Sequence, residues 1–136
     1  MLSPVVRGRW DRVDVKNDKV SILDYKSSEN VDQKKADLQT KDSTQLAIYA
    51  LAYNEIYKKI PDNLSLYFLE NGIVGDYKPT EEDLETTKEK ILEVAAKIRQ
   101  KLPGDSFIAN PVYFGREPAC VYCAYNAICP FSLVKA

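Results

Sequence analysis

The chain has 136 residues, 45% of them hydrophobic and 29% charged, a composition typical of one soluble globular domain. The net charge is −1, which excludes nucleic-acid binding through a broad basic surface and leaves only a local site for such a role. There is no histidine, which excludes a His-based triad, a His general base and a His ligand to zinc.

Membrane and export signals are missing from the sequence. No apolar run approaches the roughly 20 residues that span a bilayer, and the start, Met1-Leu2-Ser3-Pro4, lacks the pattern of a signal peptide. We therefore expect a cytoplasmic protein that has no membrane partner.

The first elements in chain order are two strands. After a lead-in at Val5-Val6, hydrophobic residues recur at every second position, as in a half-buried strand: Val13, Val15, Val20 and Ile22. Residues 16–19 are polar and typical of a turn. The pattern predicts a β-hairpin over residues 5–26.

A polar, lysine-rich segment and a helix come next. Residues 27–42 show little periodicity, which predicts a mobile loop with room for a short helix. Asp42 or Ser43 is a suitable N-cap for the following helix, which is expected to run to about Lys59 before Pro61 stops it. Its apolar residues recur at helical spacing: Leu46, Tyr49, Tyr53 and Ile56.

The remaining core elements are a strand pair and a second helix. Residues 64–69 form an apolar run that suits a buried strand, and residues 73–78 return beside it through a turn at Asn71-Gly72. Thr80 and Asp83 form a capping signal for a helix that Pro103-Gly104 ends. The apolar stripe of this helix consists of Leu84, Thr87, Ile91, Val94 or Ala95, Ile98 and Leu102.

Together these elements predict an α/β fold in a single domain over residues 1–136. A mixed β-sheet, built from the N-terminal hairpin, a central strand and its return strand, is flanked by two main helices. Residues 105–136 are expected to form an irregular, cysteine-bearing tail.

The predicted hairpin brings two carboxylates together. With a two-residue loop at Asn17-Asp18, Lys16 lies opposite Lys19, and the next pairs on the same face are Val15–Val20, Val13–Ile22, Asp11–Asp24 and Arg9–Lys26. Two carboxylates about 5 Å apart repel each other, and a divalent cation between them removes that cost. Mg²⁺ and Mn²⁺ prefer such oxygen ligands.

An alternative interpretation stays open for this pair. Asp24 and Lys26 are also compatible with an ordinary solvated ion pair at the end of an edge strand. A loop of odd length would moreover shift the register and separate Asp11 from Asp24.

Three cysteines lie within ten residues near the C-terminus: Cys120, Cys123 and Cys129. An odd number so closely spaced is not typical of a disulfide framework, whereas the spacing suits metal ligands. A tetrathiolate site needs a fourth cysteine, so zinc with a carboxylate ligand and plain buried thiols remain alternatives.

Several of these segments, in this order, resemble the RecB-type branch of the PD-(D/E)XK nuclease superfamily. They are GRWDRVD at residues 8–14, ILDYKS at 22–27, QLAIY at 45–49 and CVYC at 120–123 followed by Cys129-Pro130. Such domains are the nuclease parts of helicase–nucleases and of CRISPR-associated RecB-like exonucleases. The resemblance implies a restriction-endonuclease-like core.

The resemblance also implies a role for each matching residue. Asp11 and Asp24 would be ligands of Mg²⁺ or Mn²⁺, with the backbone carbonyl of Tyr25 as a third ligand, and Lys26 would be the catalytic lysine. Gln45 and Tyr49, which lie four residues apart on one helical face, match the helix motif beside the active site. Arg9 and Arg12 are candidates for contacts with DNA phosphates.

Two further implications concern the cysteines and the extent of the chain. Cys120, Cys123 and Cys129 match the segment that binds a 4Fe-4S cluster, whose fourth cysteine lies far upstream in the family. Many members also carry a histidine on helices before the first strand. We therefore expect the chain to be the C-terminal part of a nuclease module. Because the fourth cysteine and the histidine are absent here, this part alone is expected to hold no intact cluster, and inactivity of the isolated part stays open.

The expected function is a metal-dependent DNA nuclease, an exonuclease rather than a sequence-specific endonuclease, fused or bound to a helicase in DNA repair or recombination. Two other functions remain open. One is a catalytically inactive nuclease-fold module that binds DNA or serves as a scaffold. The other is a small redox or metal-carrier protein built around the cysteines, which would leave the hairpin carboxylates unexplained.

Overall fold

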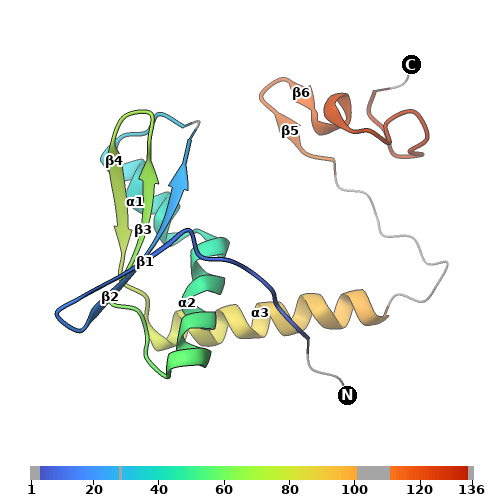
Figure 1. Cartoon of the computed structure of the whole chain (residues 1–136). Helices are drawn as coiled ribbons and strands as arrows, with labels where there is room; N and C mark the ends of the chain where they lie inside the picture. Colours follow the sequence, from blue (N-terminus) through green and yellow to red (C-terminus); the bar gives the residue numbers. More distant parts are fainter. Residues whose placement is uncertain (1–3, 28, 101–110, 135–136) are drawn as a thin grey trace. The chain divides into compact units, whose positions relative to one another are not determined.

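Four strands and three helices follow one another in the first of the two units into which the chain divides, residues 1–99 and residues 100–136. The computed structural model describes residues 4–27, 29–100 and 111–134, and each unit is described by itself. The elements of the first unit, labelled in Figure 1, are β1 (Arg12–Lys16), β2 (Lys19–Lys26), α1 (Gln33–Lys41), α2 (Thr44–Tyr57), β3 (Asn63–Phe68), β4 (Ile73–Tyr77) and α3 (Glu81–Gln100).

The sheet is mixed and has the strand order β1-β2-β3-β4. The two hairpin pairs, β1–β2 and β3–β4, are antiparallel, whereas β2 and β3 are parallel. A parallel pair needs a crossover connection, and here helices α1 and α2 provide it. The α/β fold class predicted from the sequence is confirmed.

The register of the first hairpin agrees with the prediction over the paired residues. The ladder runs from Lys16 opposite Lys19 to Arg12 opposite Leu23. Asn17 and Asp18 form the two-residue turn with φ of 50° and 60°, as the favoured hairpin turns require.

The predicted length of the hairpin is wrong, because β1 begins at Arg12 and not near Val5. The expected pairs Asp11–Asp24 and Arg9–Lys26 therefore lie beyond the end of the ladder. The segment before Arg12 packs against α2 instead, where Trp10 hydrogen-bonds to a helix carbonyl and lies against the ring of Tyr53.

The prediction of a loop with room for a short helix over residues 27–42 is confirmed only for the helix, which takes up most of the segment. Nine of these residues form α1, whose N-cap Asp32 accepts a hydrogen bond from the backbone of Lys35 at 2.8 Å. The helix buries small side chains, Ala36 and Thr40, against Gly75 of β4. A Cβ atom at Gly75 would lie only 2.3 Å from the carbonyl oxygen of Ala36, so glycine is needed for this close approach.

The other predicted helices and strands are confirmed. Ser43 caps α2 through a hydrogen bond from the backbone of Leu46, and Thr80 and Asp83 form the reciprocal cap before α3. The apolar stripe of α3 is only partly covered: Leu84 is buried, whereas Val94 and Ile98 are exposed. Leu102 and Pro103-Gly104 lie outside the described residues.

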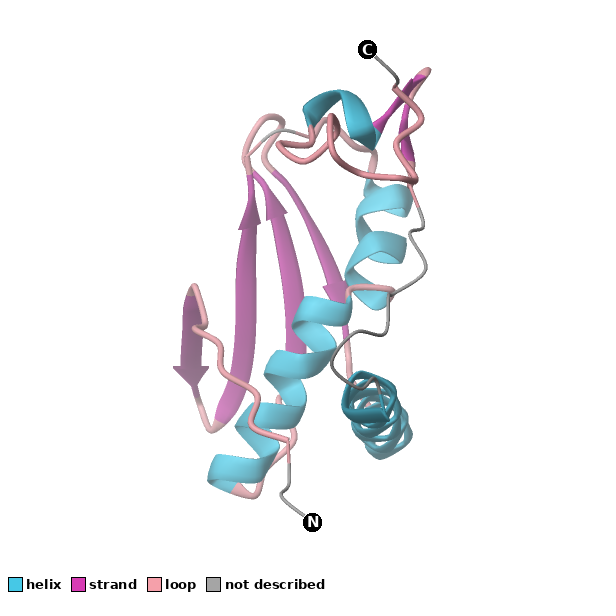
Figure 2. Cartoon of the chain, turned by 90° about the vertical axis from the view of Figure 1, so that its right-hand side faces the viewer, coloured by secondary structure: helices cyan, strands magenta, loops and turns pink. Residues whose placement is uncertain are grey.

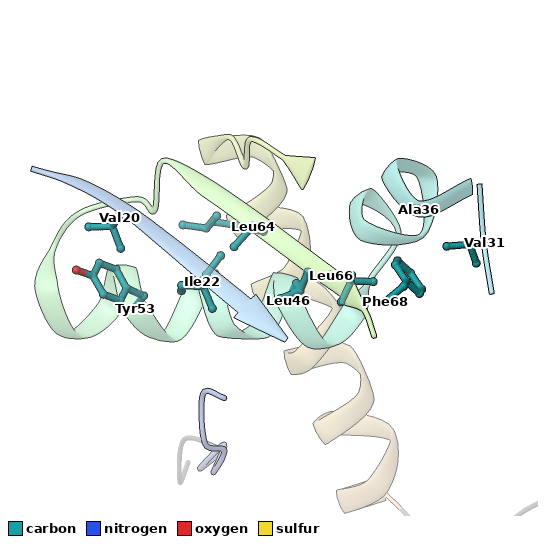
Figure 3. Packing of buried hydrophobic residues seen from close by; sticks show 11 residues of the cluster. Val20, Ile22, Val31, Ala36, Leu46, Tyr53, Leu64, Leu66 and Phe68 are labelled. Carbon is teal, nitrogen blue, oxygen red and sulfur yellow. The ribbon is translucent and has the colours of Figure 1, made fainter. Parts of the chain in front are cut away.

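Helices α1 and α2 lie on the same side of the sheet, as Figures 1 and 2 show together. Alternate residues of the two central strands point toward them (Figure 3), and Leu46, Ala50 and Tyr53 of α2 complete the core. The strand residues of this buried face are Val20 and Ile22 of β2 and Leu64, Leu66 and Phe68 of β3. Asp24 follows Val20 and Ile22 on the same face, so a carboxylate ends an otherwise apolar row.

The second unit contains a short hairpin, β5 (Tyr113–Phe114) and β6 (Glu117–Pro118), followed by the 3-10 helix η1 (Ala119–Tyr122). The remaining described residues are irregular, as predicted for the cysteine-bearing tail. Among the described helices of either unit, none combines the length and apolarity that crossing a bilayer requires.

Candidate active site

The centre of the candidate site is the carboxylate of Asp24, near the end of β2. The residue is only 2% exposed, and a buried charge without partners is costly. Both carboxylate oxygens have partners: Oδ1 accepts a hydrogen bond from Nε2 of Gln45 at 2.8 Å, and Oδ2 pairs with Nζ of Lys26 at 2.8 Å. The Lys26 side chain is one-third exposed, so this pair connects the buried carboxylate with the surface.

Gln45, in the first turn of α2, links the polar side chains of the site. Its Oε1 accepts a hydrogen bond from Lys26 at 3.2 Å, while Nε2 donates to Asp24 and, at 3.1 Å, to the hydroxyl of Tyr49. The amide thus uses both of its N–H bonds and its carbonyl. The structure brings Asp24, Lys26, Gln45 and Tyr49 together, as the sequence motifs predicted.

Asp11 reaches the same end of β2 from the segment before β1. Its Oδ2 accepts a hydrogen bond of 3.4 Å from the backbone N–H of Tyr25. The carboxylate therefore lies beside the peptide bond that joins Asp24 to Tyr25. Asp11 is exposed, in contrast to Asp24. Asp11 thus reaches this end of β2 through the contact of its side chain with the backbone of Tyr25, and not through the expected strand pair with Asp24.

The donor chemistry of this end of β2 suits a hard divalent cation. Within the described residues, no three or more His, Cys, Asp or Glu side chains form a group that could hold a metal ion. Asp11, Asp24 and the carbonyl of Tyr25 are a smaller set of oxygen donors. Mg²⁺ keeps several water ligands and is commonly held by one or two carboxylates, so the chemistry of these donors suits such an ion.

The two arginines proposed to contact DNA lie in different surroundings. Arg9 and Arg12 are both exposed. Arg12 is engaged within the hairpin, where Nε donates to Asp14 at 2.9 Å and a guanidinium N–H reaches the hydroxyl of Tyr25 at 3.5 Å. The hydrogen bond with Asp14, together with that to Tyr25, raises the pKa of Arg12 above its ordinary value.

Trp10 also belongs to this site, although sequence reasoning gave it no role. Its indole N–H donates to the carbonyl of Tyr49 at 3.4 Å, and its ring meets that of Tyr53 edge-on with the centroids 6.0 Å apart. The available signal was that the chain's one tryptophan directly precedes Asp11.

The three cysteines lie in the second unit and form no disulfide. Cys123 is exposed, and Cys120 and Cys129 are half-buried. Backbone hydrogen bonds organise the segment, including one from Cys123 to the carbonyl of Cys120 at 3.2 Å. Because the described residues contain no metal-holding group of three thiols, this arrangement does not fit an iron–sulphur cluster.

Of the three comparisons with known proteins, only the one with protein-family models found a match. Comparisons with curated proteins and with solved structures each yielded no match. The family model of the PD-(D/E)XK nuclease superfamily matches residues 4–130, a range that includes every candidate residue named above. The mixed sheet with its helices is consistent with the restriction-endonuclease-like fold of that superfamily. With its sequence matched almost from end to end, the chain belongs to the PD-(D/E)XK nuclease superfamily.

Proposed function

We propose that the chain is a Mg²⁺- or Mn²⁺-dependent deoxyribonuclease of the RecB-type branch, which degrades DNA from its ends as the nuclease module of a helicase–nuclease in repair or recombination. Membership of the superfamily supports a nuclease. The branch, the exonuclease activity and the helicase partner are supported by the motifs at residues 8–14, 22–27 and 45–49.

One observation carries the proposal: a buried carboxylate is paired with a lysine, and a second, exposed carboxylate contacts the peptide bond that follows the first. Asp24 is ion-paired with Lys26 at 2.8 Å, and Asp11 contacts the peptide that follows Asp24. A solvated surface pair, the alternative interpretation of Asp24 and Lys26, does not agree with an Asp24 that is 2% exposed.

The side chains divide the chemistry of phosphodiester hydrolysis among them. Asp11, Asp24 and the carbonyl of Tyr25 would hold the divalent ion, which when bound neutralises phosphate charge and lowers the pKa of a water ligand. Lys26 presents an ammonium group that can orient the attacking water or stabilise negative charge in the transition state. Gln45 holds Asp24 and Lys26 in one orientation and is itself fixed by Tyr49.

DNA would be positioned by the exposed cations that precede and follow Asp11. Arg9 and Arg12 are suited to phosphate contacts, which position DNA without reading its sequence. Arg12 would have to exchange its present partner Asp14 for a phosphate oxygen, whereas Arg9 lies exposed in the segment before β1.

The nuclease assay uses the full chain with Mn²⁺ and linear double-stranded DNA. We expect Asp24→Asn and Lys26→Met each to lower the rate of hydrolysis by at least about 100-fold, as is typical when a group that stabilises transition-state charge is lost. Asp62→Asn and Lys59→Met are matched controls, since Asp62 and Lys59 form an ion pair of 3.7 Å beside the other end of β2. The controls should retain the wild-type rate.

Two results would contradict the proposed activity. Unchanged hydrolysis in both site variants would show that Asp24 and Lys26 are not the catalytic groups. Failure of the wild-type chain to degrade linear or circular DNA with either ion would favour the second candidate function.

That second candidate is a catalytically inactive nuclease-fold module that binds DNA or serves as a scaffold. The net charge of −1 and the small number of side-chain donors at the site favour it. Besides the loss of hydrolysis, ion binding distinguishes the two candidates, because an inactive module should lack the divalent-ion binding that depends on Asp11.

The proposed module comprises the whole chain, with residues 105–136 as its cysteine-bearing tail. The family match crosses the boundary between the two units and extends to residue 130, which supports a common module. The proposal does not include an iron–sulphur cluster, because the three thiols are not grouped as ligands.

A further inference from the structure

The position of Asp11 is not fixed by the sheet. The ladder of β1 and β2 ends at the pair Arg12–Leu23, so the backbone at Asp11 lacks β-pairing. The contact of its carboxylate with the N–H of Tyr25 is 3.4 Å long, beyond the usual range for a strong hydrogen bond. A metal ligand must be held within about 0.5 Å of its productive position. An unpaired backbone and one long hydrogen bond do not hold the Asp11 carboxylate that closely.

The residue before Asp11 docks on helix α2 through two contacts. Trp10 donates its indole N–H to the carbonyl of Tyr49 at 3.4 Å, a hydrogen bond as long as that of Asp11, but its ring also packs edge-on against that of Tyr53, which is buried with only 8% exposure. Gly8 extends the contact, since a Cβ atom there would lie 3.6 Å from the ring of Tyr49. The segment leading to Asp11 therefore docks on one helix.

The same helix holds the other carboxylate of the site. Gln45, one turn before Tyr49, donates to Asp24 at 2.8 Å and accepts a hydrogen bond from Lys26. Helix α2 is thus a common support: Trp10 ties the Asp11 segment to it, and Gln45 ties Asp24 to it.

We propose that Trp10 is a positioning residue, which places Asp11 relative to Asp24 and thereby sets the affinity of the site for a divalent ion. This inference depends on the proposed function, in which both carboxylates bind one ion. Side chains that orient metal ligands without touching the metal typically change metal affinity by about 10- to 100-fold when they are removed.

The test measures Mn²⁺ binding by isothermal titration calorimetry with the full chain. We expect Trp10→Ala to weaken Mn²⁺ binding by about 10-fold or more. Trp10→Phe keeps an aromatic ring beside Tyr53 but loses the N–H donor, and should weaken binding by roughly threefold, the effect of one hydrogen bond.

The matched control is Tyr57→Ala. Tyr57 also packs against the ring of Tyr53, at a centroid distance of 4.5 Å, and is 57% exposed. This variant removes an aromatic neighbour of Tyr53 but leaves the Asp11 segment intact. It should lower the melting temperature, while its Mn²⁺ affinity stays within about twofold of wild type. If Trp10 only stabilised the fold, Trp10→Ala and Tyr57→Ala would instead affect Mn²⁺ affinity alike.

Several outcomes would overturn the inference. It fails if Trp10→Ala binds Mn²⁺ within about twofold of wild type, or if Tyr57→Ala weakens binding equally. If far-UV circular dichroism shows that Trp10→Ala does not fold, Trp10→Phe decides, and wild-type affinity in that variant refutes the role. Absence of Mn²⁺ binding in the wild type, or binding that persists in Asp11→Asn, instead rejects the proposed metal site and the inference with it.

Discussion

At the scale of single residues, the site depends on the amide of Gln45. Its side chain hydrogen-bonds to Asp24, Lys26 and Tyr49. The carboxylate of Asp24 is buried, and Lys26 alone would leave its Oδ1 without a partner from this network. Gln45 therefore gives the buried Asp24 carboxylate its second partner and also orients that carboxylate.

This arrangement leads to a stability prediction. We expect Gln45→Ala to lower the free energy of unfolding by about 1–3 kcal/mol, because a buried acceptor loses its partner. Gln39→Ala is a suitable control, since the hydrogen bond that Gln39 donates to Glu29 is exposed and involves no buried charge, and its loss should cost no more than about 0.5 kcal/mol. Urea denaturation measures both values, and equal losses in the two variants would contradict the account.

The candidate residues that the resemblance implied include four whose side chains form one network in the structure: Asp24, Lys26, Gln45 and Tyr49. Their common direction follows from the periodicity of the strand and of the helix. Asp11 was expected in a strand pair, but lies outside the ladder. Its contact with the backbone of Tyr25 depends on how Trp10 docks on α2, which is a tertiary effect that no local pattern encodes.

Among the secondary-structure elements, helix α1 shows why sequence periodicity predicts little more than a loop with a short helix for residues 27–42. Large apolar residues at helical spacing predict α2 and α3, whereas α1 packs through Ala36 and Thr40. Small side chains give little periodic signal, yet they allow the helix to approach β4 at Gly75. The decisive information lay in a glycine about 35 residues away, which sequence periodicity cannot connect to the helix.

The N-terminus of α3 has a pH-dependent cap. Burial raises the pKa of Asp83, but hydrogen bonds from the hydroxyl and N–H of Thr80 and from the hydroxyl of Tyr77 outweigh it, so the pKa lies below its ordinary value of 3.8. A carboxyl group whose pKa is lower in the folded state stabilises the fold above its unfolded pKa, and this contribution is lost as the pH falls through the folded value.

We therefore expect acid to destabilise the wild type more steeply than Asp83→Asn. Thermal melts followed by circular dichroism between about pH 5 and about pH 3 test this, because the amide of the variant cannot titrate in that range. The variant should have the lower melting temperature at pH 5, and the difference should shrink toward pH 3. If the melting temperatures of the two proteins fell in parallel with pH, the charge of Asp83 would make no contribution to stability.

At the scale of the whole molecule, the fold brings distant segments to one end of β2. The segment before β1, the end of β2 and the first two turns of α2 contribute Asp11, Asp24, Lys26, Gln45 and Tyr49. The crossover from β2 through α1 and α2 to the parallel strand β3 makes this possible. The sequence predicted the sheet and its main helices, whereas the division into two units was not anticipated.

Joint binding of one divalent ion by Asp11 and Asp24 underlies the proposed activity, and a calorimetric Mn²⁺ titration of the full chain measures it. We expect one ion per wild-type chain, and loss of binding in both Asp11→Asn and Asp24→Asn. Asp14→Asn is the control, because Asp14 belongs to the same motif but pairs with Arg12, and it should bind as the wild type does. Wild-type Mn²⁺ affinity in Asp11→Asn would contradict joint binding.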